Sequence, residues 1–199
     1  MSLWRGESLV LASKSEVRRN LLEAAQIPVT IDSANIDERE IEARHTGLSP
    51  EDAALLLARE KALFVARRRK GLILGADQTL ALGDLRFSKP ANVAAAREHL
   101  KSLAGRTHAL HSAAALARDG EVIFETVSTA RLSMRPLSEG FLDAYLEAAG
   151  AQVTKSVGAY QLEGLGVHLF EKVEGDHFTV LGLPLLSLLA YFRKADLLP

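Results

Sequence analysis

Four groups of polar residues in this chain of 199 residues have the types and spacing that phosphate chemistry requires. The first is a turn, Ser13-Lys14-Ser15, which follows a short apolar strand and precedes Arg18 and Arg19 in the opening turn of an expected helix. Free backbone N–H groups at a helix start, hydroxyl donors and forked guanidinium groups together bind phosphate oxygens. Arginines exposed to water on an amphipathic helix would explain the same residues equally simply.

The second group is a single carboxylate, Asp77, inside the apolar run 72–82. An ionised carboxylate that is buried without a partner costs several kcal/mol. We therefore expect Asp77 to lie at the end of a buried strand and to face a cation or a cleft. An aspartate that only caps or turns the chain is the alternative interpretation.

The third group is a pair of lysines, Lys61 and Lys89. Lys61 falls at the edge of the apolar stripe of an expected helix, so its ammonium can reach into a cleft. Lys89 precedes Pro90, which favours an extended backbone and gives the side chain a fixed direction. Lysine ammonium groups more often reach out to water, which is the simpler interpretation of both.

The fourth group is acidic and lies in the polar connection 35–42. Asp37, Glu38 or Glu40 could bring a second carboxylate to Asp77 and bind Mg²⁺ or Mn²⁺ together with phosphate oxygens. Charges of a solvated loop are the alternative. The six histidines lack the spacing of metal ligands, and we assign them no role.

The elements that must position these groups alternate between strand and helix, which predicts an α/β fold with a mixed, twisted sheet and flanking helices. Asp119-Gly120 predicts a tight hairpin between two long strands. No linker or repeat divides the chain, so residues 1–199 are expected to form one domain. Helices are expected over 15–25, 49–69, 92–104, 138–149 and from 184, and strands over 8–13, 29–34, 72–82, 107–117, 121–134, 153–162 and 167–173.

Composition narrows the classes of function. A chain with 48% hydrophobic and 25% charged residues is typical of a globular protein. The absence of cysteine excludes a disulfide framework, a thiolate metal site and a cysteine nucleophile, and it fits a reducing compartment such as the cytoplasm. A balance of 24 basic and 25 acidic residues provides no overall field for nucleic acid or an anionic membrane, so we expect neither partner.

Taken in order along the chain, these segments resemble the Maf family of nucleoside triphosphate pyrophosphatases. The resemblance implies an inosine-triphosphatase-like fold with two lobes around a cleft, often a homodimer, and hydrolysis of a nucleotide to a monophosphate and pyrophosphate. The matching segments are LASKSEVRRNLL (11–22), IDE (36–38), LAREKA (57–62), LGADQT (74–79), KP (89–90), LAGRTH (103–108), GAYQLEGLG (158–166) and VLGLPLLSLL (180–189).

The resemblance also implies roles for single residues. Asp77 corresponds to the catalytic base, which would take a proton from the water that attacks the α-phosphorus. A divalent cation, Mg²⁺ or Mn²⁺, would be held by Glu38 and Asp77. The positions that hold the triphosphate correspond to Ser13, Arg18, Arg19, Lys61 and Lys89.

Two further positions, Gln78 and Glu163, concern the base of the nucleotide. The family branch that acts on thymidine and uridine triphosphates resembles Asp-Thr and Ile-Gln-Gly at these places. This chain instead has Asp77-Gln78 and Glu163-Gly164, which is similar to the branch that acts on 7-methylguanosine triphosphate. A carboxylate at Glu163 can accept from the N1–H and exocyclic amine of guanine.

We therefore expect a pyrophosphatase for non-standard or modified nucleotides, with 7-methyl-GTP as the first candidate substrate and dTTP or UTP as the alternative. Glu16 stands where the family usually has proline, and Val17 where the methylguanosine branch tends to have tryptophan. These two residues leave room for a third interpretation. In it, the chain is a catalytically weak nucleotide-binding regulator linked to cell division.

Overall fold

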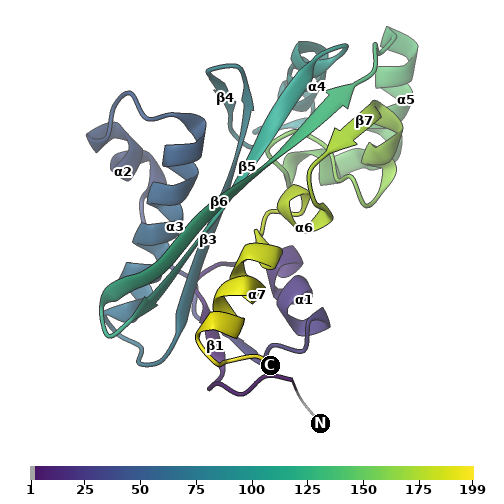
Figure 1. Cartoon of the computed structure of the whole chain (residues 1–199). Helices are drawn as coiled ribbons and strands as arrows, with labels where there is room; N and C mark the ends of the chain where they lie inside the picture. The colour runs from purple at the N-terminus through teal and green to yellow at the C-terminus, as the bar shows by residue number, and fades with distance from the viewer. Residues whose placement is uncertain (1–2) are drawn as a thin grey trace. The chain divides into compact units, whose positions relative to one another are not determined.

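The computed structural model describes residues 3–199, and it confirms the expected mixed sheet with flanking helices (Figure 1). The strand order of the sheet is β2-β1-β3-β5-β6-β7, and β4 pairs with β3. The strands are β1 (Leu9–Leu11), β2 (Val29–Ile31), β3 (Ile73–Leu82), β4 (Leu85–Phe87), β5 (Thr107–Arg118), β6 (Glu121–Met134) and β7 (Phe170–Glu174). The helices are α1 (Glu16–Ala24), α2 (Glu38–Arg44), α3 (Pro50–Ala66), α4 (Val93–Leu103), α5 (Glu139–Ala149), α6 (His177–Val180) and α7 (Leu185–Lys194), with 3₁₀ turns η1 (Gly150–Thr154) and η2 (Leu165–Leu169).

The sheet is mixed in strand direction. β1 runs parallel to both β2 and β3, whereas β4 is antiparallel to β3 and β7 is antiparallel to β6. β5 and β6 are joined at Asp119 and Gly120, whose φ angles of 52° and 85° are both positive. Two positive φ angles in a two-residue connection suit the right-handed twist of the strands, as the predicted hairpin requires.

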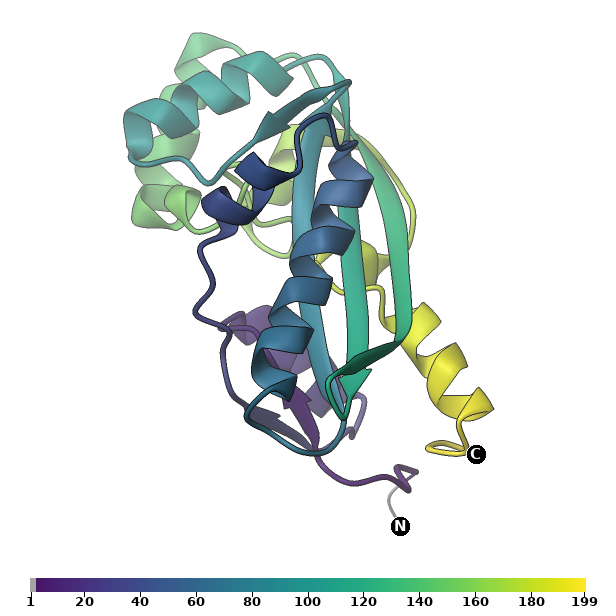
Figure 2. The ribbon, with the colours of Figure 1, turned by 90° about the vertical axis from the view of Figure 1, so that its left-hand side faces the viewer.

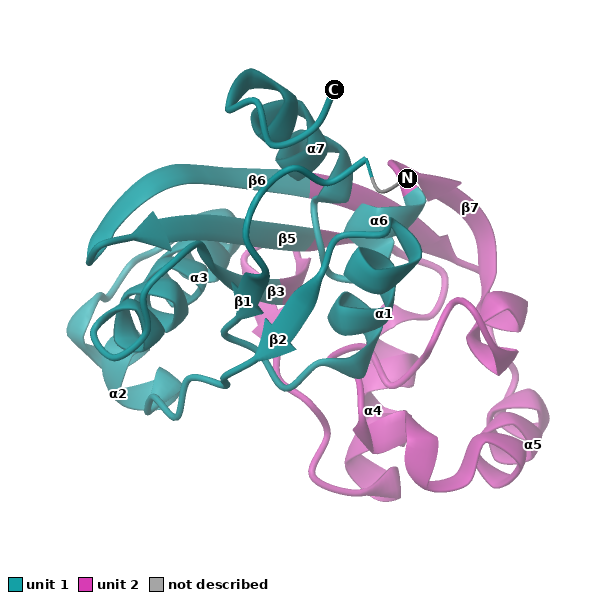
Figure 3. Cartoon of the chain, turned by 90° about the horizontal axis from the view of Figure 1, so that it is seen from below, with its two compact units in different colours: residues 1–78, 111–128, 177–199 teal, residues 79–110, 129–176 magenta. Residues whose placement is uncertain are grey.

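The fold divides into two compact units, which Figure 3 colours separately. Of the described residues, unit 1 contains 3–78, 111–128 and 177–199, and unit 2 contains 79–110 and 129–176. Three of the four boundaries fall within β3, β5 and β6, and the fourth lies between β7 and α6. This division explains why no linker is visible in the sequence.

Unit 1 has three layers, with α3 on one face of its strands and α1 and α7 on the other. Because side chains alternate along a strand, Ile73 packs with the alanines of α3 while Leu74 packs with Leu22 of α1 and Leu188 of α7. Figure 2 shows α3 lying along its face of the sheet. At the other face, Trp4 meets Phe192 of α7 edge-on, with 5.1 Å between the ring centroids.

Unit 2 packs α4, α5 and η1 against one another. Leu100 of α4 and Leu142 of α5 are buried there. The Tyr145 hydroxyl of α5 donates to the Ala159 carbonyl at 3.2 Å, which attaches the following segment to the helix. Within residues 3–199 no helix is long and apolar enough to cross a membrane.

The expected strand over 153–162 is wrong. Residues 150–154 form η1 and turns follow it, and Ala159 has a positive φ angle of 60°, which an extended strand excludes. The strand expected over 167–173 is shorter and later, as β7. The connection 35–42, expected to be irregular, contains the start of α2, whose first turn is capped by the Asp37 carboxylate.

Candidate active site

Asp77 is carried by β3, and the alternation of that strand decides what it faces. Ile73 and Gly75 point towards α3, so Asp77, two residues further, points to the same side. Ala76 and Gln78 point to the opposite side, where α1 and the C-terminal segment lie. The predicted carboxylate is therefore directed at the helix that contains Lys61.

Lys61 joins two carboxylates. Its Nζ lies 2.5 Å from Oδ1 of Asp77 and 2.7 Å from Oε1 of Glu38. The Lys61 and Asp77 side chains are only 10% and 13% exposed, whereas that of Glu38 is 50% exposed. We call these three residues the Glu38-Lys61-Asp77 cluster. It brings together three of the residues that the sequence selected.

Local sequence explains how the two helices present these groups. α3 begins at Pro50, and the Ser49 hydroxyl accepts from the Asp52 N–H, so the helix start is fixed by a good N-cap and a proline at its first position. Lys61 follows three turns later on the buried stripe. Glu38 is the first residue of α2, directly after its capping aspartate.

The pKa of Asp77 depends on the positive charges beside it. Burial raises the pKa of Asp77, the positive charges of Lys61 and Arg18 oppose that rise, and the negative charge of Glu38 adds to it. Burial lowers the pKa of Arg18, and the charges of Asp77 and Glu38 oppose that change. Arg18 therefore belongs to the electrostatic environment of Asp77.

Arg18 is held in place by three hydrogen bonds. Its Nη1 donates to the Ser13 hydroxyl at 3.1 Å and to the Ala76 carbonyl at 2.9 Å, and its Nε donates to the Gly182 carbonyl at 2.8 Å. Ala76 directly precedes Asp77. Arg18 thus fixes both the turn that begins α1 and the backbone beside the carboxylate.

Arg19 and Gln78 make other contacts. The Nε atom of Arg19 lies 3.7 Å from Glu23 one helical turn away. The amide nitrogen of Gln78 donates to the Ser112 hydroxyl at 3.0 Å and to the Thr179 carbonyl at 3.1 Å, on the face opposite Asp77. That these two residues bind substrate stays a prediction.

Lys89 and Glu163 belong to unit 2. Lys89 is exposed and follows β4, and Glu163 is exposed in a turn that the Gly164 N–H closes by donating to the Gln161 carbonyl at 3.1 Å. Their predicted contacts with the triphosphate and the base also stay predictions.

The two carboxylates of the cluster fit a metal ion that takes its other ligands from water and from the phosphates of the substrate. Among residues 3–199 there is no group of three or more histidines or carboxylates that could hold a metal ion. Glu38 and Asp77 supply two carboxylates, held together by one ammonium. Mg²⁺ is commonly bound by one or two carboxylates and completes its coordination with water and substrate phosphates.

Comparison with known proteins shows to which family this chain belongs. The sequence profile of the family described as "Maf-like protein" matches residues 8–195. The chain belongs to this Maf-like family.

Relatives within the Maf-like family are similar over their whole length. A "Nucleoside triphosphate pyrophosphatase" of Bradyrhizobium diazoefficiens is 56% identical over 200 residues, covering 100% of this chain and 99% of the relative. A "7-methyl-GTP pyrophosphatase" of Mesorhizobium japonicum is 52% identical over 190 residues, covering 94% and 96%. A solved HAM1 protein of Coxiella burnetii is 15% identical, with a TM-score of 0.49, and the match covers 92% of this chain and 98% of the HAM1 chain.

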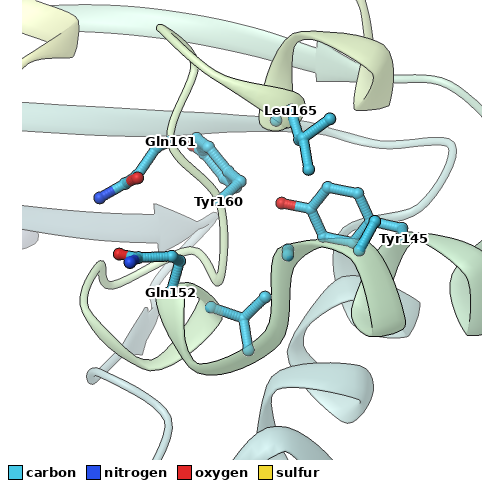
Figure 4. Close-up of a pocket in the computed structure, with 9 residues that line it drawn as sticks. Tyr145, Gln152, Tyr160, Gln161 and Leu165 are labelled. Carbon is cyan, nitrogen blue, oxygen red and sulfur yellow. The ribbon is translucent and has the colours of Figure 1, made fainter.

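Unit 2 of this Maf-like chain also contains a cavity of about 170 Å³ (Figure 4). None of its lining side chains is charged, so the cavity by itself cannot neutralise a triphosphate. The Tyr145 hydroxyl already donates to Ala159, and the Tyr160 hydroxyl lies 2.6 Å from Nε2 of His108. The lining residues are Tyr145, Ala148, Ala149, Gln152, Val153, Tyr160, Gln161, Leu165 and Gly166.

Sequence reasoning missed the groups that hold Arg18 and Gln78. The carbonyls of Ala76 and Gly182 are backbone atoms, so no residue type marks them. Ser112 and Thr179 are fully buried polar residues, and only their burial shows that they need partners. A buried hydroxyl in an alanine-rich strand is the one signal that could have found Ser112.

Proposed function

We propose that this Maf-like chain is a nucleoside triphosphate pyrophosphatase, a hydrolase that splits the bond between the α- and β-phosphates. The observation that carries the proposal is the Asp77 carboxylate held on the Lys61 ammonium, with Arg18 fixed on the residue before it. The names of relatives at 55–56% identity over the full chain support the same reaction.

Asp77 is the proposed general base. Burial raises the pKa of this carboxyl, which strengthens it as a base, while the positive charges of Lys61 and Arg18 oppose that rise. Asp77 accepts a proton from water as the water oxygen forms a bond to the α-phosphorus. The bond from that phosphorus to the bridging oxygen breaks, and the electron pair leaves with pyrophosphate.

The cations of the site stabilise the charge that moves onto the phosphate oxygens. Lys61 and Arg18 are fixed before substrate arrives, so little reorganisation is needed during the reaction. The Ser13 hydroxyl accepts from Arg18 at 3.1 Å, and we propose that it donates its own proton to a phosphate oxygen of the substrate. We also propose that Arg19 and Lys89 bind the outer phosphates. Glu38 and Asp77 would hold Mg²⁺ or Mn²⁺, which supplies positive charge to those oxygens when bound.

The first experiment measures pyrophosphate release from a panel of nucleoside triphosphates with Mg²⁺ or Mn²⁺. Asp77→Asn should abolish release with the fold intact, because an amide cannot accept the proton. Asp84→Asn, which changes an exposed aspartate, is the matched control and should retain full activity. Folded wild type that binds triphosphates tightly but releases no pyrophosphate would favour the regulatory interpretation instead.

We propose 7-methyl-GTP as the preferred substrate, with Glu163 reading the base. The relative from Mesorhizobium japonicum named for this substrate supports the proposal. Hydrolysis of 7-methyl-GTP, UTP and dTTP should be compared between wild type and Glu163→Gln, with Glu171→Gln, an exposed carboxylate of β7, as the control. A shift towards the pyrimidines only in Glu163→Gln is expected, because an amide offers a donor that a carboxylate lacks. An unchanged profile removes Glu163 from base recognition.

We also propose that the chain acts as a homodimer in the cytoplasm, without nucleic-acid or membrane partners. The absence of cysteine and the net charge of −1 support the location and the lack of polyanionic partners. Light scattering on purified protein tests the dimer, and a mass of one chain would contradict it.

A further inference from the structure

The backbone of α3 passes very close to β3 at Gly75, beside the Glu38-Lys61-Asp77 cluster. Gly75 faces the helix two residues before Asp77. A Cβ atom at Gly75 would lie 2.0 Å from the Ala58 carbonyl oxygen and 2.6 Å from the Ala62 backbone nitrogen. Both are backbone atoms of α3, so no side-chain rotation can relieve the overlap.

Space, and not backbone conformation, requires glycine here. Eight other glycines have positive φ angles, which side chains disfavour, but Gly75 is not among them. It lies in the regular strand β3, within the buried run 73–76. The missing Cβ therefore serves the approach of the helix to the strand.

That approach sets the height of Lys61 above the sheet. Ala58, Lys61 and Ala62 belong to one turn of α3, and both alanines are fully buried against the strands. The short Ala58 and Ala62 side chains and the absent side chain of Gly75 bring the helix backbone close to β3. From there the ammonium of Lys61 meets Asp77 at 2.5 Å.

We infer that Gly75 is a positioning residue for the proposed reaction, which sets the distance between the Lys61 ammonium and the Asp77 carboxylate. The inference rests on the proposed function. A Cβ must move from 2.0 Å to at least 3.4 Å from the Ala58 oxygen to reach ordinary contact, so α3 must shift by about 1.4 Å. A misplacement of that size can cost about 100-fold in rate.

The test compares Gly75→Ala with Val65→Ala, which destabilises the same helix–strand interface by removing buried volume without separating its backbones. Two quantities are measured in each folded variant: pyrophosphate release, and the acylation rate of Lys61 relative to exposed Lys70, read by mass spectrometry. Gly75→Ala should lose about 100-fold in kcat/KM and expose Lys61 to acylation. Val65→Ala should lose thermal stability but keep both values.

A compensating variant separates positioning from general damage. Arginine reaches further than lysine, so Lys61→Arg added to Gly75→Ala should recover about tenfold of the lost activity, although Lys61→Arg alone lowers activity. If Gly75→Ala does not fold, Ala62→Val separates the same two backbones less strongly, because the Ala62 Cβ lies 3.0 Å from the place where a Gly75 Cβ would stand.

Unchanged activity and unchanged Lys61 acylation in a folded Gly75→Ala protein overturn the inference, as does equal loss in Val65→Ala. These outcomes leave the proposed function standing if the wild type hydrolyses nucleotides. If the wild type hydrolyses none, the acylation rates still report whether Gly75 controls the lysine–carboxylate contact.

Discussion

Replacing Lys61 with methionine keeps most of the buried stem and removes the charge of the cluster. Burial raises the pKa of Asp77, and the Lys61 ammonium is the largest influence that lowers it. Without the ammonium, the pKa of Asp77 rises further. At a pH between the unfolded and the folded pKa of Asp77, this carboxyl therefore keeps its proton in folded Lys61→Met, whereas it has released the proton in the unfolded chain.

The sign of the resulting pH dependence follows from that difference. A carboxyl whose folded pKa lies above its unfolded pKa contributes stability that is fully present below the unfolded pKa and is lost as pH rises through the folded pKa. Relative to wild type, Lys61→Met should therefore lose least at pH 4 and progressively more above it, by at most about 1.4 kcal/mol for each pH unit. The total is bounded at about 3–5 kcal/mol, the cost of leaving a buried charge unpaired.

Urea denaturation followed by circular dichroism between pH 4 and 8 measures this dependence. The control Lys101→Met removes an ammonium from an exposed pair with Glu139, and its small effect should be similar across this range. Adding Asp77→Asn to Lys61→Met removes the titrating group, so the steep loss should disappear. A loss independent of pH, or one that persists in the double variant, would refute the reasoning.

Three further predictions concern other groups. Burial lowers the pKa of His108 from 6.5 to about 4, so the unfolded chain binds a proton at a higher pH than the folded chain does. The free energy of unfolding should therefore fall as pH drops, by about 2 kcal/mol between pH 6.5 and 5. In urea denaturation, His108→Phe should make the free energy of unfolding less dependent on pH over this range. Gly182→Ala forces a side chain into φ +97° beside the Arg18 guanidinium, and should cost about 1–3 kcal/mol in thermal unfolding and lower kcat. Glu38→Gln should raise the Mg²⁺ concentration that gives half-maximal pyrophosphate release about tenfold, and an unchanged requirement would remove Glu38 from the metal site.

The sequence predicted the long elements well because their patterns are strong. Ser49 and Pro50 mark the start of α3, and Asp119-Gly120 marks the hairpin of β5 and β6. The sequence prediction was wrong where the local conformation depends on a single residue with a positive φ angle. Ala159 has a positive φ of 60°, which no apolar pattern reveals, so the strand predicted over 153–162 does not form.

The candidate site was predictable in part for a similar reason. A lone carboxylate in a buried strand must find a cation, and Lys61 is that cation. Whether a neighbouring residue shares the site depends on strand alternation. Gln78 follows Asp77 directly, yet it points to Ser112 and Thr179 on the other face of β3. Gln78 therefore belongs to the same sequence motif as Asp77, but its side chain lies on the opposite face of the strand.

The short segment 75–78 shows how one strand serves both faces. Gly75 and Asp77 face α3, where the first admits the helix and the second meets its lysine. The Ala76 carbonyl accepts from Arg18 and the Gln78 amide donates to the Thr179 carbonyl, so the same four residues are also fixed by hydrogen bonds on the opposite face of β3. A carboxylate on a strand fixed from both sides has little freedom to move away from its ammonium, which is the preorganisation that a general base beside charged phosphates requires.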